Sequence, residues 1–170
     1  DNKAVQALIL APTRELALQV SQEINRLAKY KNVEAIAIYG GEDIGKQIRG
    51  LKKNPQIVVA TPGRFMDHMR RNTINLANIQ TVILDEADEM LSMGFIEDIE
   101  TILQEVPSER QTLLFSATMP KRIQAVSQKF MKSPQTVAVK NKTMTVDTIE
   151  QRYLDLKEKE ILCADRSYNS

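Results

Sequence analysis

The feature that most constrains the fold is a regular alternation between short apolar runs and longer segments with helical spacing. Most of the apolar runs are nearly continuous in apolar side chains, and polar or glycine-containing turns follow them. The six runs are Ala7–Ala11, Ala35–Tyr39, Ile57–Ala60, Thr81–Asp85, Thr112–Ser116 and Thr136–Val139. Such runs are typical of strands that are buried on both faces of a parallel sheet.

The segments between these runs repeat apolar residues every three or four positions, which predicts helices with one buried face. The predicted faces are Leu16, Val20, Ile24 and Leu27, then Ile44, Ile48 and Leu51, then Phe95, Ile99, Ile102 and Val106, and finally Ile123, Val126 and Phe130. A strand followed by a helix, repeated, predicts right-handed βαβ units and an α/β sandwich. Ile149–Leu156 alternates like a further strand, and the polar residues after it predict a linker or frayed tail.

Composition narrows the class of protein. The chain has 170 residues, enough for one domain with a core. The net charge is +1, so any nucleic-acid binding must come from local patches. Cys163 is the single cysteine and His68 the single histidine, which excludes an internal disulfide and a Cys/His zinc cluster, and gives His68 a surface or packing role. The chain contains no run of about eighteen apolar residues, so no membrane span is predicted. The first residues have no signal-peptide character, so we expect a cytoplasmic protein.

Acidic residues follow the predicted strand Thr81–Asp85. The strand ends in Asp85, Glu86, Ala87 and Asp88. Magnesium takes oxygen ligands, and nucleotide enzymes supply one or two carboxylates while waters and phosphates complete its coordination. A second carboxylate then orients or deprotonates the attacking water. The same residues also fit a solvated acidic turn that opens a helix, because carboxylates favour helix N-termini.

Two hydroxyl residues, Ser116 and Thr118, come at the end of the next predicted strand. Because the carboxyl ends of parallel strands meet at one edge of the sheet, these hydroxyls can bridge to an acidic partner on a neighbouring strand. They also suit capping of the helix that follows Pro120. The two interpretations are compatible.

Three other strand ends suit phosphate groups. Pro12 and Thr13 open a predicted helix and place Arg14 in its first turn, where a cation is unfavourable unless a phosphate lies nearby. Residues 61–64, Thr-Pro-Gly-Arg, repeat this arrangement, and the glycine pair 40–41 lets a backbone approach a ligand closely. Together these sites predict contacts to several consecutive phosphates. The alternative is three unrelated turns with two surface arginines.

The ordered set of these strings resembles the DEAD-box RNA helicase family. The strings are PTRELA at 12–17, GG at 40–41, TPGR at 61–64, DEAD at 85–88 and SAT at 116–118. Each is weak evidence alone, but their order and approximate spacing are specific, and the resemblance covers roughly residues 7–130. The sequences that flank these motifs are similar to those of the bacterial, cold-shock-associated branch.

The resemblance implies a three-layer RecA-like domain of the P-loop NTPase type, with a mostly parallel sheet and helices on both faces. Residues 1–156 would form part of the first helicase domain, and 157–170 the linker or tail. The parent protein would use ATP and Mg²⁺ to unwind short RNA duplexes locally. Its implied partners are the RNA backbone, a second RecA-like domain, and proteins of RNA decay or ribosome assembly.

The resemblance also implies roles for individual acidic and hydroxyl residues. Asp85 corresponds to the family's magnesium-orienting carboxylate, which acts mostly through water, and Glu86 to the residue that activates the hydrolytic water. Asp88 corresponds to the residue that is linked to Ser116 and Thr118 and so couples the ATP site to strand separation.

A second group of residues corresponds to the family's RNA-binding positions. They are Pro12, Thr13, Arg14, Gly40, Gly41, Thr61, Gly63 and Arg64. Such contacts read phosphate and 2′-hydroxyl groups, so the expected RNA binding is independent of base sequence.

The sequence departs from the family pattern before Pro12. The family's glycine-rich phosphate loop belongs upstream of this point, but the eleven preceding residues contain no glycine. The pair Gly45 and Lys46 cannot replace it, since Gln47 follows where Ser or Thr is needed. The family's adenine-recognising motif and second domain are also missing from these 170 residues. We therefore expect this chain alone to bind and hydrolyse ATP very weakly.

Two other classes of function remain open at this point. The chain could be a non-enzymatic truncated domain that binds RNA backbone or a protein partner, which the absent phosphate loop favours for the chain alone. It could also belong to a nucleotide-driven enzyme that acts on DNA. The PTRELA wording and Asp88 favour RNA, through the family resemblance.

Overall fold

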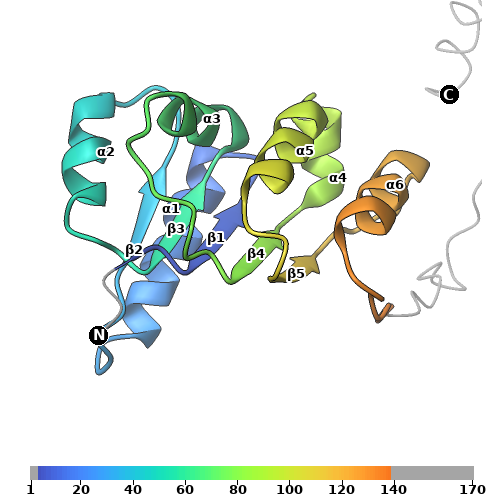
Figure 1. Cartoon of the computed structure of the whole chain (residues 1–170), viewed down its shortest axis with the longest axis horizontal. Coiled ribbons are helices and arrows are strands. Elements are labelled where there is room, and N and C mark those ends of the chain that lie inside the picture. The colour runs from blue at the N-terminus through green and yellow to red at the C-terminus, as the bar shows by residue number, and fades with distance from the viewer. Residues whose placement is uncertain (1–3, 139–170) are drawn as a thin grey trace, which may run out of the picture. The chain divides into compact units, whose positions relative to one another are not determined.

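A computed structural model describes residues 4–138 of the chain. Within them, five parallel strands form one sheet in the order β2-β3-β1-β4-β5, which Figure 1 shows from left to right. The strands are β1 (Ala7–Leu10), β2 (Ala35–Ile38), β3 (Ile57–Ala60), β4 (Thr81–Leu84) and β5 (Gln111–Leu114). The predicted parallel α/β fold is confirmed, and the first five predicted strands are present with ends shifted by at most two residues.

Six helices connect or follow these strands in the described part of the chain. They are α1 (Arg14–Leu27), α2 (Ile44–Leu51), α3 (Pro62–Arg70), α4 (Ala87–Ser92), α5 (Ile96–Glu105) and α6 (Lys121–Phe130). Local chemistry explains where several of them begin. The hydroxyl of Thr13 accepts the Leu16 N–H at 3.2 Å, and the carboxylate of Asp43 accepts the Lys46 N–H at 2.8 Å. Helix α3 begins with Pro62, whose fixed φ suits a first helical position.

The sheet separates two apolar clusters. Successive side chains of a strand point to opposite faces, so Leu8 and Leu10 join one cluster while Ile9 joins the other. The larger cluster receives residues from α2, α3, α4, α5 and α6, including Phe65 and Ile102. Helix α1 covers the second face, on which Leu16, Val20 and Ile24 pack against Ile9, Ala11 and Val59. The predicted three-layer arrangement with helices on both faces is therefore confirmed.

Two expectations about apolar residues are wrong. Residues 136–138 of the predicted strand Thr136–Val139 have no strand structure, and Val137 is 94% exposed. A strand requires a ladder partner, and residues 136–138 pair with none of the described strands. Leu27 was expected on the buried face of α1, yet it is 71% exposed and is the last residue of the helix.

The chain divides into two units after Pro134. The predicted strand Ile149–Leu156, the boundary between residues 156 and 157, and Cys163 all lie outside the described residues, so these predictions stay untested.

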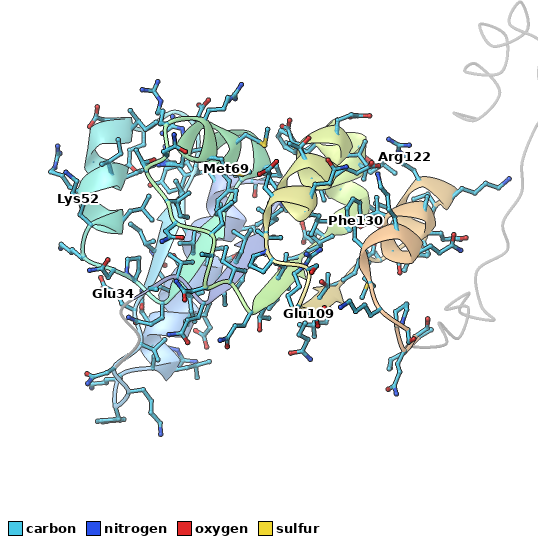
Figure 2. All side chains as sticks on the ribbon, viewed as in Figure 1. Glu34, Lys52, Met69, Glu109, Arg122 and Phe130 are labelled. Carbon is cyan, nitrogen blue, oxygen red and sulfur yellow. The ribbon has the colours of Figure 1, made fainter. Side chains whose placement is uncertain are left out.

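Helix α6 is attached to α5 by charge as well as by apolar packing. Arg122 lies 3.2 Å from Glu100, and Phe130 packs against the larger apolar cluster (Figure 2).

Candidate active site and nucleic-acid interface

All the predicted site residues lie at the carboxyl edge of the sheet, where ligands of open α/β sheets bind. Hydrogen bonds between neighbouring strands continue just past the strand ends. The N–H groups of Thr61, Ala11 and Asp85 donate to the carbonyls of Ile38, Ala60 and Leu10, respectively, at 2.9 Å each. The first residues of these turns are therefore held in place by the sheet. Above β2, β3 and β1 lie the predicted RNA-contact residues, and above β4 and β5 lie the predicted catalytic and coupling residues.

Glu86 has an unusual backbone conformation. Its φ of 50° and ψ of 53° are left-handed, and it stands immediately before α4 as the residue that caps the helix. A non-glycine residue in this region is strained by about 1–2 kcal/mol. The strain turns the chain sharply between the end of β4 and α4, and it leaves the Glu86 side chain exposed. Strain of this kind is concentrated at functional sites, which supports the predicted role of Glu86.

The structure brings together Asp88, Ser116 and Thr118, as the sequence predicted. Both the backbone N–H and the hydroxyl of Thr118 donate to Oδ2 of Asp88 at 2.8 Å. The N–H of Asp88 donates to Oγ of Ser116 at 3.1 Å, and that hydroxyl donates to the Thr118 carbonyl at 2.6 Å. These bonds join the start of α4 to the loop after β5.

The hydrogen bonds also fix the charge of Asp88. Donation by the Thr118 hydroxyl is the largest cause, and it acts with the Thr118 backbone to lower the pKa of Asp88 from 3.8 to about 2. The carboxylate is therefore ionised at neutral pH, as an acceptor of several N–H and O–H groups should be. Thr118 is exposed, so the linked groups remain accessible to water.

A cavity of about 650 Å³ opens beside this link. It is lined by Thr13, Asp85, Glu86, Asp88, Glu89, Phe115, Ser116 and Ala117. Four of these side chains are carboxylates, and Phe115 contributes an exposed apolar surface. An acidic cavity of this kind suits a nucleotide whose phosphates carry a cation.

Residues 4–138 contain no group of three or more His, Cys, Asp or Glu side chains arranged to hold a metal ion. Asp85 is the predicted magnesium-orienting residue. Its half-buried carboxylate lines the cavity and makes no hydrogen bond or ion pair within the described residues, so its oxygens are free to face a hydrated cation. No described helix is long and apolar enough to cross a membrane.

Thr13 and Arg14 lie where β1 meets α1. Thr13 caps the helix, while Pro12 is buried beneath it. The guanidinium of Arg14 is exposed and lies over the ring of Tyr39, 4.9 Å from its centroid. This cation–π contact joins the end of β1 to the end of β2, although β3 lies between the two strands. It holds the positive charge at the surface.

The glycine pair forms the turn between β2 and α2. Gly41 has a φ of 79°, which side chains rarely adopt, so this position requires glycine. Gly40 has no such conformation, and a Cβ atom there would meet nothing within 4 Å. The space above Gly40 is therefore open to a ligand, as the predicted close approach requires.

Thr61, Gly63 and Arg64 lie at the start of α3. Thr61 precedes the helix with an extended backbone, and its hydroxyl makes no capping hydrogen bond. A Cβ atom on Gly63 would meet only one atom within 4 Å, the carboxylate of Asp98 at 3.9 Å. Arg64, predicted to contact phosphate, is not the free surface arginine of the alternative interpretation. Its side chain is 13% exposed, and its Nη1 donates to the carbonyl of Glu42 at 2.9 Å.

Gln47 and Tyr39 also belong to this interface, although neither was predicted from the sequence. Gln47 is 2% exposed and lies between the glycine turn and Arg64. A signal was present, since Gln47 lies three residues after Ile44 and four before Leu51, on the apolar face of the helix. The packing role predicted for His68 is confirmed, because its side chain is completely buried beside Gln47.

Comparisons with known proteins identify the family of this chain. The family model described as DEAD/DEAH box helicase matches residues 1–126. A Listeria monocytogenes protein named ATP-dependent RNA helicase CshA is 61% identical over 92% of this chain. A Bacillus subtilis protein named DEAD-box ATP-dependent RNA helicase CshA is 58% identical over 91% of it. The chain spans about 30% of the length of these curated relatives.

Solved structures give the same result. A DEAD box protein from Methanococcus jannaschii is 52% identical, with a TM-score of 0.75, and the match covers 78% of this chain and 36% of that one. A Sulfolobus tokodaii structure, titled a hypothetical ATP-dependent RNA helicase, is 41% identical, with a TM-score of 0.73, over 77% of this chain and 39% of that one. The predicted RecA-like fold and the resemblance to the bacterial, cold-shock-associated branch are confirmed. This chain belongs to the DEAD/DEAH box helicase family.

Proposed function

We propose that this chain is part of the first motor domain of an ATP-dependent RNA helicase, which separates short RNA duplexes in the cytoplasm. The observation that carries the proposal is the hydrogen-bonded link between Asp88 and Thr118, which lies beside the acidic cavity. This link connects residues suited to nucleotide chemistry with the end of the last described strand. The names of the relatives support ATP and RNA as substrates.

The proposed chemistry divides between two carboxylates. Asp85 would hold Mg²⁺, mostly through water, and the ion would neutralise charge on the nucleotide phosphates. Glu86 would orient and activate the water that attacks the terminal phosphate. Its strained backbone supports this role, because the residue has a left-handed conformation immediately before α4 and its side chain is exposed.

RNA would bind along the ends of β2, β3 and β1. Arg14 and Arg64 would contact phosphates, and the open backbone at Gly40 would let the strand approach closely. The eight predicted contact residues follow three neighbouring strands of the sheet, so one nucleic-acid strand could meet all of them except Pro12, which is buried. We propose a second RecA-like domain as the partner that completes the ATP site, and proteins of RNA decay or ribosome assembly as partners of the whole helicase.

A chimera tests this proposal. This chain would replace the matching segment of the Bacillus subtilis relative, and ATP hydrolysis would be measured with and without single-stranded RNA. We expect RNA to stimulate hydrolysis in the chimera, and Glu86→Gln to lower the rate by about 10²–10⁴-fold, the usual contribution of a general base. RNA binding should change little, since Glu86 is not one of the proposed RNA contacts.

The control is Glu105→Gln, which removes an exposed carboxylate near the end of α5, away from the cavity. Hydrolysis by this variant should equal that of the unmodified chimera. A Glu86→Gln chimera with normal RNA-stimulated hydrolysis would overturn the proposed role of Glu86. A chimera without any hydrolysis would favour the non-enzymatic alternative, in which this domain binds RNA backbone alone.

A further inference from the structure

A buried glutamine connects two of the three segments that carry the proposed RNA contacts, the turn after β2 and the start of α3. Gln47 of α2 is 2% exposed, and its side-chain amide uses all its hydrogen-bonding positions. Nε2 donates to the carbonyl of Tyr39 at 2.9 Å and to the carboxylate of Glu42 at 3.1 Å. Oε1 lies 3.2 Å from Nη1 of Arg64 and 3.1 Å from Nε2 of His68.

The chemistry of these partners fixes the orientation of the amide. The Tyr39 carbonyl can only accept a hydrogen bond, and the Arg64 guanidinium can only donate one. Exchanging the oxygen and nitrogen of Gln47 would therefore place acceptor against acceptor and donor against donor. Glutamate could not replace Gln47, because a carboxylate would face both the Tyr39 carbonyl and the Glu42 carboxylate.

His68 supports this arrangement from the other side. It is completely buried, and burial together with the nearby Arg64 charge lowers its pKa, so the ring is neutral at neutral pH. A neutral ring that donates from Nε2 to Gln47 must accept at Nδ1, where the Thr73 hydroxyl lies at 2.8 Å. Each buried side-chain nitrogen and oxygen around Gln47 then has a partner, in agreement with the absence of unpaired buried side-chain atoms among residues 4–138.

The consequence for Arg64 is a fixed guanidinium. Nη1 donates to the Glu42 carbonyl at 2.9 Å and to Gln47 at 3.2 Å, so both of its hydrogens point into the protein. Nη2 makes no hydrogen bond within the described residues, and Nε lies 4.0 Å from the Asp67 carboxylate. One side of the planar group is held, and the other remains for a ligand.

We propose that Gln47 is a positioning residue for RNA binding, which holds the inner side of Arg64 so that the outer side meets an RNA phosphate. This inference rests on the proposed RNA-binding function. A guanidinium that is already oriented loses less side-chain entropy on binding than a free one. The same amide also donates to the Tyr39 carbonyl, and the Arg14 guanidinium lies over the Tyr39 ring. Gln47 therefore helps to fix the position of Arg14 relative to Arg64.

Equilibrium binding of a fluorescent single-stranded RNA to the 170-residue chain, over a range of salt concentrations, tests this inference. The variants are Arg64→Ala, Gln47→Met and the double variant. Methionine has nearly the shape of glutamine but makes none of the four contacts. Each lost phosphate contact should reduce the salt slope by about 0.7, the value for single strands.

We expect Arg64→Ala and Gln47→Met each to weaken RNA binding by about tenfold and to reduce the salt slope by similar amounts. The double variant should bind no more weakly than Arg64→Ala, because Gln47 acts through Arg64. The control is Leu51→Ala, which removes a buried side chain from the same helix without touching the amide. It should lower thermal stability and leave the salt slope unchanged.

The outcomes separate the inference from the proposed function. If the unmodified chain shows no salt-dependent RNA binding, or if Arg64→Ala keeps the full salt slope, the proposed RNA contact fails and the inference fails with it. If Arg64→Ala has the expected effect but Gln47→Met keeps the full salt slope, the inference alone is wrong. Additive effects in the double variant, or a reduced slope in Leu51→Ala, would also overturn it.

Nuclear magnetic resonance of the arginine side chains gives a direct second readout. In the free chain, the Nη1 hydrogens of Arg64 should exchange slowly because two acceptors hold them. They should exchange at the rate of an exposed arginine in Gln47→Met, while Gln47→Glu should disturb Tyr39 as well. Slow exchange that persists in Gln47→Met would contradict the proposed positioning role.

Discussion

The two halves of the carboxyl edge hold their polar groups in different ways. Above β4 and β5, the link between Asp88 and Thr118 is made by short hydrogen bonds at a residue that is exposed to water. Above β2 and β3, the link between α2 and α3 runs through Gln47 and His68, which are almost completely buried. Both halves start from the same rigid sheet, but water can compete with the bonds of one half and not with those of the other.

This difference has a functional meaning for a motor domain. Exposed hydrogen bonds can break and form again at little cost, because water replaces the lost partner. Buried polar groups cost about 1–3 kcal/mol each when their partners are removed. The acidic half is therefore suited to a change between states, and the Gln47 half is suited to a fixed platform for the RNA backbone.

The largest expected effect comes from breaking the buried half. Gln47→Ala should lower the free energy of unfolding by about 3 kcal/mol, since it leaves a cavity and removes the buried partners of His68 and Tyr39. Urea denaturation of the chain measures this loss. Gln124→Ala, at an exposed amide that bonds only to the Met119 carbonyl, is the matched control and should change stability by less than about 0.5 kcal/mol.

A smaller loss is expected from the glycine turn that leads into α2. Gly41→Ala should cost about 1 kcal/mol, because its φ of 79° is unfavourable for a side chain even where space is open. The strain should also shift Glu42, whose carbonyl accepts a hydrogen bond from Arg64, so RNA affinity should fall with stability. Thermal unfolding and RNA titration of the same sample measure both effects, and a fully stable Gly41→Ala variant would contradict the structure.

Removing the exposed link should affect stability less. Asp88→Ala should change the free energy of unfolding by less than about 1 kcal/mol, because exposed polar links are screened by water. The contribution of this carboxylate is present above its unfolded pKa of 3.8 and is lost as the pH falls toward its folded pKa of about 2. Melting temperatures of the native chain and Asp88→Ala should therefore differ at pH 7 and converge near pH 2.

The smallest expected effect on stability is at Gly40. Gly40→Ala places a methyl group where nothing lies within 4 Å and no left-handed conformation is needed, so stability should hardly change. If RNA passes close to this backbone, affinity should nevertheless fall by several-fold. Unchanged RNA affinity in a fully folded Gly40→Ala variant would remove Gly40 from the proposed interface.

Much of the fold was predictable from the sequence, for physical reasons that particular residues show. Strands buried on both faces, such as Ile57–Ala60, consist of apolar residues whichever way they point, so the sequence identifies them directly. The run at residues 136–139 has the same composition, but a strand also needs a partner, and composition does not reveal one. Leu27 shows the corresponding limit for helices, because periodicity does not show whether the last turn of a helix is still covered by other residues.

The candidate site was predictable where chemistry is carried by a residue's type and its place after a strand. Asp88, Ser116 and Thr118 were expected to meet because neighbouring strands end together, and they do. The strained backbone of Glu86 had no sequence signal, since glutamate is not a usual left-handed residue. The role of Gln47 depends on four partners from separate segments, which only the folded chain brings together.

Duplex separation by the chimera with the Bacillus subtilis relative tests the proposed helicase function and the role of the Asp88 link together. Short RNA and DNA duplexes would be compared in the presence of ATP, for the unmodified chimera and for Asp88→Ala. We expect the unmodified chimera to separate RNA but not DNA, and Asp88→Ala to keep its RNA affinity within about twofold while losing duplex separation. Separation of RNA at the normal rate by Asp88→Ala, or a preference for DNA, would contradict these expectations.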